Sequence, residues 1–169
     1  MSEKRDIDKK AVSYKGLFKA EELYKSIDEW RKENGYEIAL EKHSEVVSEK
    51  GKEVEFPMGF EKKASDYVKF AIKAKITLKN VEDVLVKKGG AQQKLHKGDV
   101  DVAMKAVIET DYDNKWSKKP WRVFIRGLHD KFLRKSEIDD FEKKLKGDLS
   151  SLYEEVKAQL NLFKYKGLW

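Results

Sequence analysis

The chain has 169 residues, of which 40% are charged, and its formal net charge is +6 at pH 7. This length suits one domain, and we expect residues 1–169 to fold as a single unit with a flexible tail over residues 1–6. The absence of cysteine excludes disulfides, thiolate metal sites and thiol nucleophiles.

The first ten residues, MSEKRDIDKK, lack the apolar core of a signal peptide. No window reaches the run of about 18 apolar residues that a membrane span needs, so we expect a cytoplasmic protein. Residues 7–16 predict a short first strand. Residues 19–35 predict a helix, because Leu23, Ile27 and Trp30 recur at helical spacing.

Alternation of apolar and polar residues predicts strands after this helix. Tyr36, Ile38 and Leu40 would face one way and form a half-buried strand. A further strand covers residues 54–60, where Pro57 indicates an edge position or a bulge.

The clearest strand pattern covers residues 68–79, with one apolar face and one face rich in lysine. Val84 begins another strand, which turns at Gly89-Gly90 into a polar run through His96. Gly98 opens the last strand, in which apolar residues again alternate with polar ones.

The last third of the chain predicts helices. Pro120 suits the first turn of one helix, and Ser136 suits the start of a second. An apolar stripe spaced by three and four follows over residues 138–163. Gly147 and Asp148 interrupt this stripe, and Asp148 could cap a separate final helix.

This order predicts an α+β fold with an antiparallel β-sheet of about five to seven strands. One face of the sheet would be covered by the N-terminal helix and a long C-terminal helical segment. The order resembles the helix-grip fold of the START and plant-allergen-like (SRPBCC-like) superfamily. That resemblance implies an apolar ligand between the sheet and the long helix. We expect a monomer by default.

The two ends of the chain carry a closer resemblance. The segment YKGLFKAEELYKSIDEWRKENGYE, residues 14–37, and the segment from DYDNKWSKKPW to QLNLF, residues 111–163, look like a family of uncharacterised archaeal proteins. The resemblance covers about half of the chain and brings no activity, cofactor or catalytic residue with it. It implies a cytoplasmic archaeal protein.

A basic segment, KWSKKPWRVFIRGLHDKFLRK over residues 115–135, gives the strongest functional signal. It holds eight Lys or Arg and one acid, Asp130, so it carries +7 while the rest of the chain sums to −1. As a helix it would turn its apolar stripe to the core and its arginines to solvent. Arginine favours bidentate contacts with phosphate. The predicted polyanion-binding residues are Lys115, Trp116, Lys118, Lys119, Arg122, Arg126 and Arg134.

Three interpretations of this basic segment remain open. It is an ordinary solvated helix face, a surface that binds RNA or a ribonucleoprotein, or an amphipathic helix on a membrane. We favour RNA, because Trp116 lies outside the main stripe and can stack on a base. A membrane would instead need Trp121, Phe124 and Phe132, for which the core competes.

A second hypothesis places an apolar small molecule or lipid in the cleft between sheet and helix. Large apolar side chains would line that cleft, although the same side chains could fill it as packed core. The candidate cleft residues are Trp30, Phe56, Met58, Phe60, Phe70, Met104 and Phe124.

Other patterns are weaker candidates for a site. A lysine row over residues 69–79 lacks the interleaved aromatic residues of an RNA-binding sheet, and we interpret it as an exposed outer face. Glu109, Asp111 and Asp113 resemble a calcium loop without its glycine and final glutamate. The three histidines are too scattered for a zinc site.

We therefore expect no catalytic residue, no metal and no cofactor. The first hypothesis is a non-enzymatic binding module that docks on an anionic macromolecule, with RNA favoured. The alternatives are a carrier of an apolar small molecule and, less favoured, a protein that associates with a membrane surface.

Overall fold

The computed structural model describes residues 3–41, 44–48, 51–110 and 134–166. Its strands form one antiparallel sheet with the order β1-β6-β5-β4-β2, and β3 pairs with the first residues of β4 on the same edge as β2. The elements are β1 (Glu3–Phe18), α1 (Ala20–Glu33), β2 (Glu37–Glu41), β3 (Ser44–Ser48), β4 (Gly51–Lys63), β5 (Val68–Lys88), β6 (Ala91–Thr110) and α3 (Arg134–Lys166).

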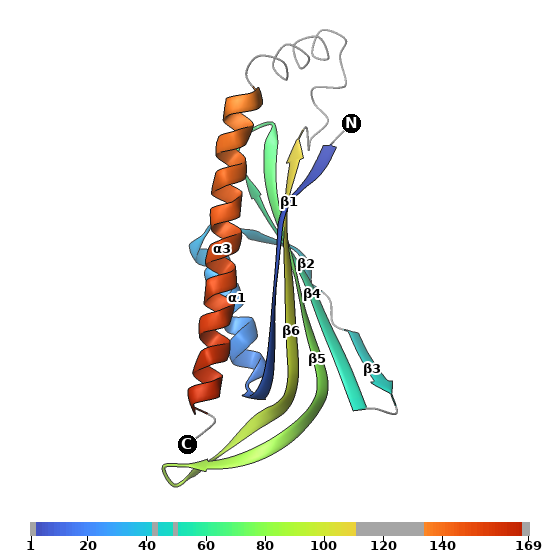
Figure 1. The fold of residues 1–169 in the computed structure, drawn as a ribbon, viewed down its shortest axis with the longest axis vertical. Coiled ribbons are helices and arrows are strands. Elements are labelled where there is room, and N and C mark those ends of the chain that lie inside the picture. Colours follow the sequence, from blue (N-terminus) through green and yellow to red (C-terminus); the bar gives the residue numbers. More distant parts are fainter. Residues whose placement is uncertain (1–2, 42–43, 49–50, 111–133, 167–169) are drawn as a thin grey trace.

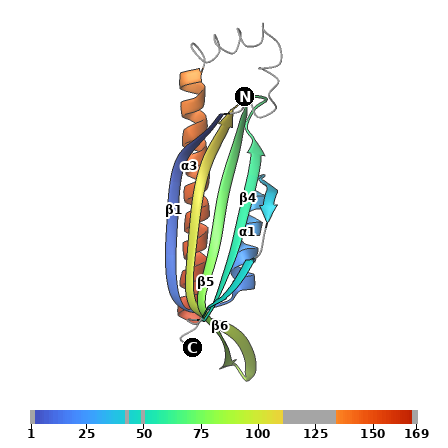
Figure 2. The ribbon, with the colours of Figure 1, turned by 90° about the vertical axis from the view of Figure 1, so that its right-hand side faces the viewer.

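The two described helices, α1 and α3, lie on one side of the sheet (Figure 1). Figure 2 shows them behind the sheet, with α3 towards the β1 side and α1 towards the β4 side. The predicted α+β fold is therefore confirmed, with a helix after the first strand and a long helix at the C-terminal end. We call the face of the sheet turned to the helices the inner face, and the opposite face the outer face.

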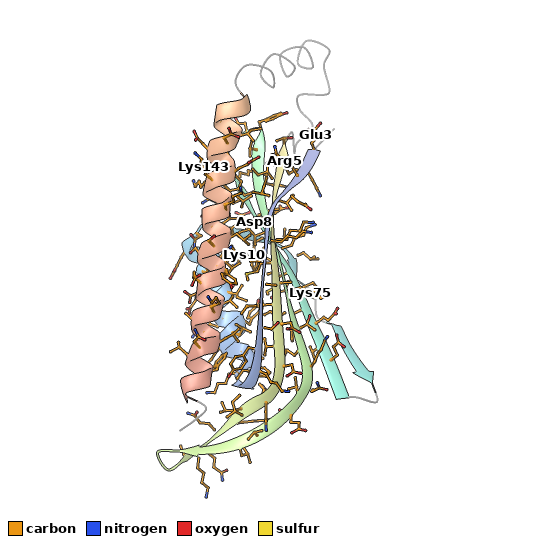
Figure 3. All side chains as sticks on the ribbon, viewed as in Figure 1. Glu3, Arg5, Asp8, Lys10, Lys75 and Lys143 are labelled. Atoms are coloured by element: carbon orange, nitrogen blue, oxygen red, sulfur yellow. The ribbon has the colours of Figure 1, made fainter. Side chains whose placement is uncertain are left out.

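The inner face is apolar because side chains alternate along each strand. In β5, Phe70, Ile72 and Ala74 are buried on the inner face, whereas Lys73 and Lys75 are exposed on the outer face. Figure 3 shows Lys75 directed away from the helices. The amphipathic pattern of the sequence thus determines which face the helices cover.

The long helix α3 covers the inner face along β1 and β6. Its apolar stripe recurs every three or four residues, which keeps it on one side of the helix. Beside this stripe, Asp148, Ser151 and Glu155 accept hydrogen bonds from α1 and from Tyr36. The buried residues of the stripe are Ile138, Leu145, Leu149, Leu152, Val156, Leu160 and Phe163.

The strands are longer than predicted. The flexible tail expected over residues 1–6 is wrong for residues 3–6, because β1 begins at Glu3, which pairs with Thr110. The polar run after Gly90 is also strand, because it pairs with the second half of β5. Backbone ladder bonds need no apolar side chains, so alternation did not reveal it. Gly89 and Gly90 have φ of +59° and +81°, as a tight hairpin turn requires.

The expected half-buried strand at residues 36–40 is wrong in one respect. Tyr36 is buried, but Ile38 and Leu40 are 45% and 41% exposed. The register shifts between them, so that Ile38 lies opposite Phe60 on the inner face and Leu40 opposite Gly59 on the outer face. A bulge moves a side chain to the other face, which strict alternation does not anticipate.

The expected break in the C-terminal helix is also wrong. The helix α3 runs without interruption through Gly147, and a Cβ at that residue would meet no atom within 4 Å. Asp148 caps no helix; its carboxylate accepts a hydrogen bond of 2.7 Å from the Tyr36 hydroxyl. Neither described helix is long and apolar enough to cross a membrane.

Candidate functional site

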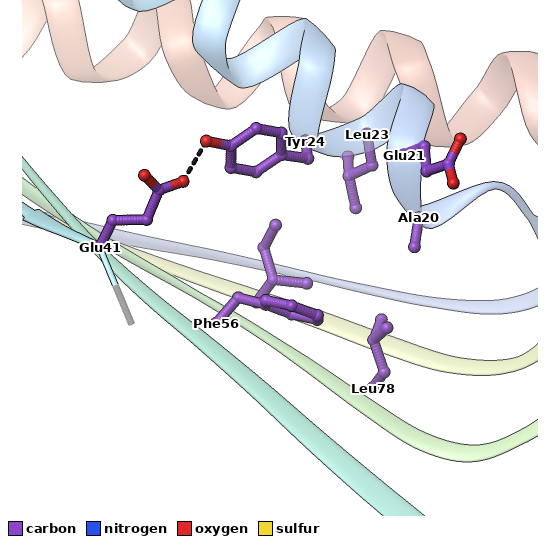
Figure 4. A pocket seen from close by; sticks show the side chains of 8 residues that line it. Ala20, Glu21, Leu23, Tyr24, Glu41, Phe56 and Leu78 are labelled. Atoms are coloured by element: carbon purple, nitrogen blue, oxygen red, sulfur yellow. Dashed lines mark hydrogen bonds between the residues drawn. The ribbon is translucent and has the colours of Figure 1, made fainter. Parts of the chain in front are cut away.

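An open cavity of about 490 Å³ lies between α1 and the inner face of β4 and β5 (Figure 4). Its wall on the helix side comes from the first turns of α1. Its wall on the sheet side comes from the middle of β4 and β5 and from the last residue of β2. The lining residues are Ala20, Glu21, Leu23, Tyr24, Glu41, Phe56, Ile76 and Leu78.

The cavity exists because α1 is attached to α3 more closely than to the strands. The Ser26 hydroxyl donates to Glu155 at 3.0 Å, and the Trp30 indole N–H donates to Ser151 at 3.0 Å. The backbone of α1 lies close to α3 and only sparsely close to the sheet. The N-terminal turns of α1 therefore stand over β4 and β5 with Leu23 packed into the core and an open space left beside it.

Contacts of the buried Tyr36 side chain strengthen the attachment of α1 to α3 at the C-terminal end of α1. Its ring stacks on Trp30, with ring centroids 5.5 Å apart, and its hydroxyl donates to Asp148 of α3. Burial, and after it the hydrogen bond to Asp148, raise the pKa of Tyr36 above the ordinary tyrosine value. The phenol therefore stays neutral and keeps the proton that it donates to Asp148.

Most of the cavity surface is apolar. Leu23, Ile76 and Leu78 are almost fully shielded from solvent, and Phe56 is half-buried. A ligand that covers the exposed part of the apolar lining, to which Phe56 contributes, would release water favourably. The walls therefore suit a hydrocarbon group.

One end of the cavity carries a polar pair. The Tyr24 hydroxyl donates a hydrogen bond to the carboxylate of Glu41, which ties α1 to the end of β2 (Figure 4). This bond is the first cause that raises the pKa of Tyr24 to about 12. At neutral pH the phenol therefore keeps its proton, although its residue is 37% exposed.

The structure separates the seven predicted cleft residues. Phe56 lines the cavity. Trp30 and Phe70 belong to the packed core, where the Phe70 ring meets Phe141 of α3 edge-on at 5.9 Å. Phe124 lies outside the described residues. The remaining three, all buried in the same core, are Met58, Phe60 and Met104.

Sequence reasoning missed the polar end of the site. Tyr24 has a detectable signal, since it is an aromatic residue beside, and not within, the stripe that packs the helix. Glu41 has none, because its approach to Tyr24 depends on where β2 ends.

The outer face gathers lysines in one row. The register places Lys9, Lys105 and Lys73 side by side on β1, β6 and β5. They border a shallow trough of about 600 Å³ with a floor of small residues that includes Ala103. Lys105 pairs with Asp6 at 2.8 Å, and this bond lowers the pKa of that carboxyl.

Neither Lys9 nor Lys73 forms an ion pair with any residue that the structure describes. Like charges directly opposite each other on neighbouring strands destabilise a sheet. The expected lysine-rich outer face is thus present, and part of it is neutralised: Lys69 contacts Glu61 at 3.3 Å and Glu109 at 3.2 Å.

The predicted polyanion site falls on a part of the chain outside the described residues. Arg134 is the first residue of α3. The acidic residues Asp111 and Asp113 also lie outside the described part, and within it no group of three or more histidines and acids is arranged to hold a metal. The basic residues outside the described part are Lys115, Lys118, Lys119, Arg122 and Arg126, together with Trp116.

No family model, curated protein or solved structure matches the chain. The resemblances to archaeal proteins and to the helix-grip superfamily therefore stay predictions.

Proposed function

We propose that the protein binds an apolar small molecule in the cavity between α1 and strands β4 and β5. The observation that carries this proposal is a cavity of about 490 Å³ whose surface is almost entirely apolar, with one polar pair at its end. Small-molecule sites commonly occupy about 300–1,000 Å³ and combine apolar walls with a few placed polar groups. The size and the lining both fit this class of site.

Burial of a hydrocarbon chain would supply the binding energy. Each buried methylene group contributes about 0.8 kcal/mol. The walls are largely preformed, because hydrogen bonds from Ser26 and Trp30 hold α1 on α3. A preformed site loses little free energy to ordering when the ligand enters.

Native mass spectrometry of the protein purified from its host tests this proposal. We expect a reproducible extra mass that is released on denaturation. The matched control is Ala20→Leu, which places a larger side chain in the cavity; this variant should carry no extra mass. A bare chain in both samples would contradict the proposal.

A second candidate function is docking on an anionic macromolecule, with RNA favoured. Two observations support it: the +7 charge of residues 115–135, and the row of Lys9, Lys105 and Lys73 on the outer face. A cationic surface attracts phosphates with a strong dependence on salt.

Retention on immobilised RNA across a salt series tests this second candidate. Replacing Arg122, Arg126 and Arg134 by glutamine should weaken retention and flatten its salt dependence. Unchanged retention would contradict RNA docking by this segment. Retention on anionic vesicles and not on RNA would assign the surface to a membrane.

We also propose that the chain shares the helix-grip architecture and works in the cytoplasm of an archaeon. The curved sheet with α3 along its inner face supports the first part. The resemblance of residues 14–37 and 111–163 to archaeal proteins supports the second.

A further inference from the structure

The polar end of the cavity offers hydrogen-bond acceptors. A tyrosine hydroxyl has one hydrogen, and Tyr24 gives it to Glu41. The oxygen of Tyr24 is then left with lone pairs only. The ionised carboxylate of Glu41 accepts hydrogen bonds and donates none. A head group that binds here must therefore bring its own donor.

The charge around the cavity is negative. Glu21 and Glu41 are both lining residues, and no described lysine or arginine lines the cavity with them. The raised pKa of Tyr24 means that its phenol stays neutral and adds no negative charge of its own. At the Glu41 end, a carboxylate or phosphate head group would face this charge without a donor to offset it.

The polar end and the apolar end are separated in space. Figure 4 shows Tyr24 and Glu41 at one end of the cavity and Ala20 and Leu78 at the other, where the exposed Glu21 side chain is directed away from Leu78. The start of α1 brings free backbone N–H groups to the Ala20 end, where Glu21 and Glu22 in the first turn offset the helix dipole. A ligand would therefore place its head at Glu41 and its tail against Leu78.

We propose that the ligand is an amphiphile whose head group is a protonated amine, and that Glu41 selects this head group. The proposal rests on the ligand-binding function proposed above. An ammonium group supplies both the donors and the positive charge that the polar end lacks. The rings of Tyr24 and Phe56, which border the cavity, also attract a cation to their faces.

Calorimetric titration with three ligands of equal chain length tests the head group. The probes are decylamine, 1-decanol and decanoate at pH 7, each below its micelle-forming concentration. Because the tail is the same, differences in affinity report the head group. We expect decylamine to bind about tenfold more tightly than 1-decanol, as a charge-assisted hydrogen bond allows. Decanoate should bind more weakly than 1-decanol.

Two glutamate variants test the role of Glu41. Glu41→Gln removes the charge and keeps the size of the side chain, and it should make the affinities for decylamine and 1-decanol equal. Glu37→Gln is the matched control, because Glu37 is exposed on the same strand and does not line the cavity; its preference for the amine should be unchanged.

Each outcome separates the two proposals. Equal affinities of the unaltered protein for amine and alcohol, or tighter binding of decanoate, would overturn the head-group assignment and leave the binding function in place. A preference for the amine that survives Glu41→Gln would overturn the role of Glu41. Binding of none of the three ligands would overturn the proposed function itself.

Discussion

The two halves of the inner face differ in how they are covered. Along β1, β6 and the first residues of β5, α3 packs a continuous stripe in which Leu145, Leu149 and Leu152 have no exposed surface. Along the middle of β4 and β5, the cover is the N-terminal part of α1, and a cavity of about 490 Å³ is left beneath it. One half of the same curved sheet is filled, and the other is hollow.

Helix length explains part of this difference. The 33 residues of α3 span about 50 Å, whereas the 14 residues of α1 span about 21 Å. A short helix held on α3 by Trp30 and Ser26 reaches only part of β4 and β5. A hollow on a sheet can therefore result from where a helix is attached, and not from the residues of the strands alone.

Removal of one phenylalanine from each half should give the largest difference in unfolding free energy between the two halves. Phe70→Ala opens a void in the filled half, where the ring is fully buried against Phe141, and should cost about 4 kcal/mol of unfolding free energy. Phe56→Ala lies at the hollow, where part of the ring is already exposed, and should cost about half as much. Urea denaturation of both variants measures the difference. Equal losses of unfolding free energy in the two variants would contradict the presence of a cavity beside Phe56.

Addition of side-chain volume should show the same contrast, with the larger loss of stability again in the filled half. Ala106 has no exposed surface on the inner face, so Ala106→Leu should destabilise the protein by about 2 kcal/mol through overpacking. Ala20→Leu places the same extra volume in the cavity and should leave the midpoint of thermal unfolding nearly unchanged. Leucine has almost the helix propensity of alanine, so α1 should tolerate it. A large loss for Ala20→Leu would mean that no space is available there.

The attachment of α1 to α3 should depend on pH. Tyr36→Phe removes the hydrogen bond to Asp148 and should cost about 1 kcal/mol at pH 8. The raised pKa of Tyr36 stabilises the folded protein below the ordinary value of 10.0, and this stability is lost as pH rises further, because the unfolded tyrosine ionises first. The difference between the two proteins should therefore shrink above pH 10.

Urea denaturation at pH 8 and at pH 11 measures this change. The other tyrosines and the lysines are common to both proteins, so they cancel in the comparison. A difference that is constant or grows with pH would contradict the raised pKa.

The smallest expected effect concerns the continuity of α3. Gly147→Ala should stabilise the protein by about 0.7 kcal/mol, since glycine weakens a helix interior and the added methyl group meets no neighbour. Calorimetric unfolding provides the measurement. Destabilisation by this substitution would indicate a helix break at Gly147, as the sequence pattern had predicted.

Periodicity predicted the fold class because the two faces of the strands differ so strongly in chemistry. The lysines that alternate with Phe70, Ile72 and Ile76 indicate which side needs a cover, and the stripe of α3 supplies it. The hairpin extension after Asn80 was predicted less well. Its ladder depends on backbone pairing, and its residues are largely polar.

The candidate site was predicted only in part, because it depends on distances across the fold. Phe56 was among the expected cleft residues, whereas Tyr24 and Glu41 were not. Their contact joins residues 17 positions apart in the sequence and depends on where β2 ends. A pattern along the chain does not contain that information. It also does not show that α1 would be attached to α3.

Methyl NMR during titration with 1-decanol tests the hollow half most directly. The methyl groups of Leu23, Ile76 and Leu78 line the cavity, whereas those of Leu145, Leu149 and Leu152 belong to the filled half. We predict saturable shifts of the first three methyl-bearing residues and almost none of the last three. Shifts spread equally over both sets, or no saturable shift, would contradict a ligand site between α1 and the sheet.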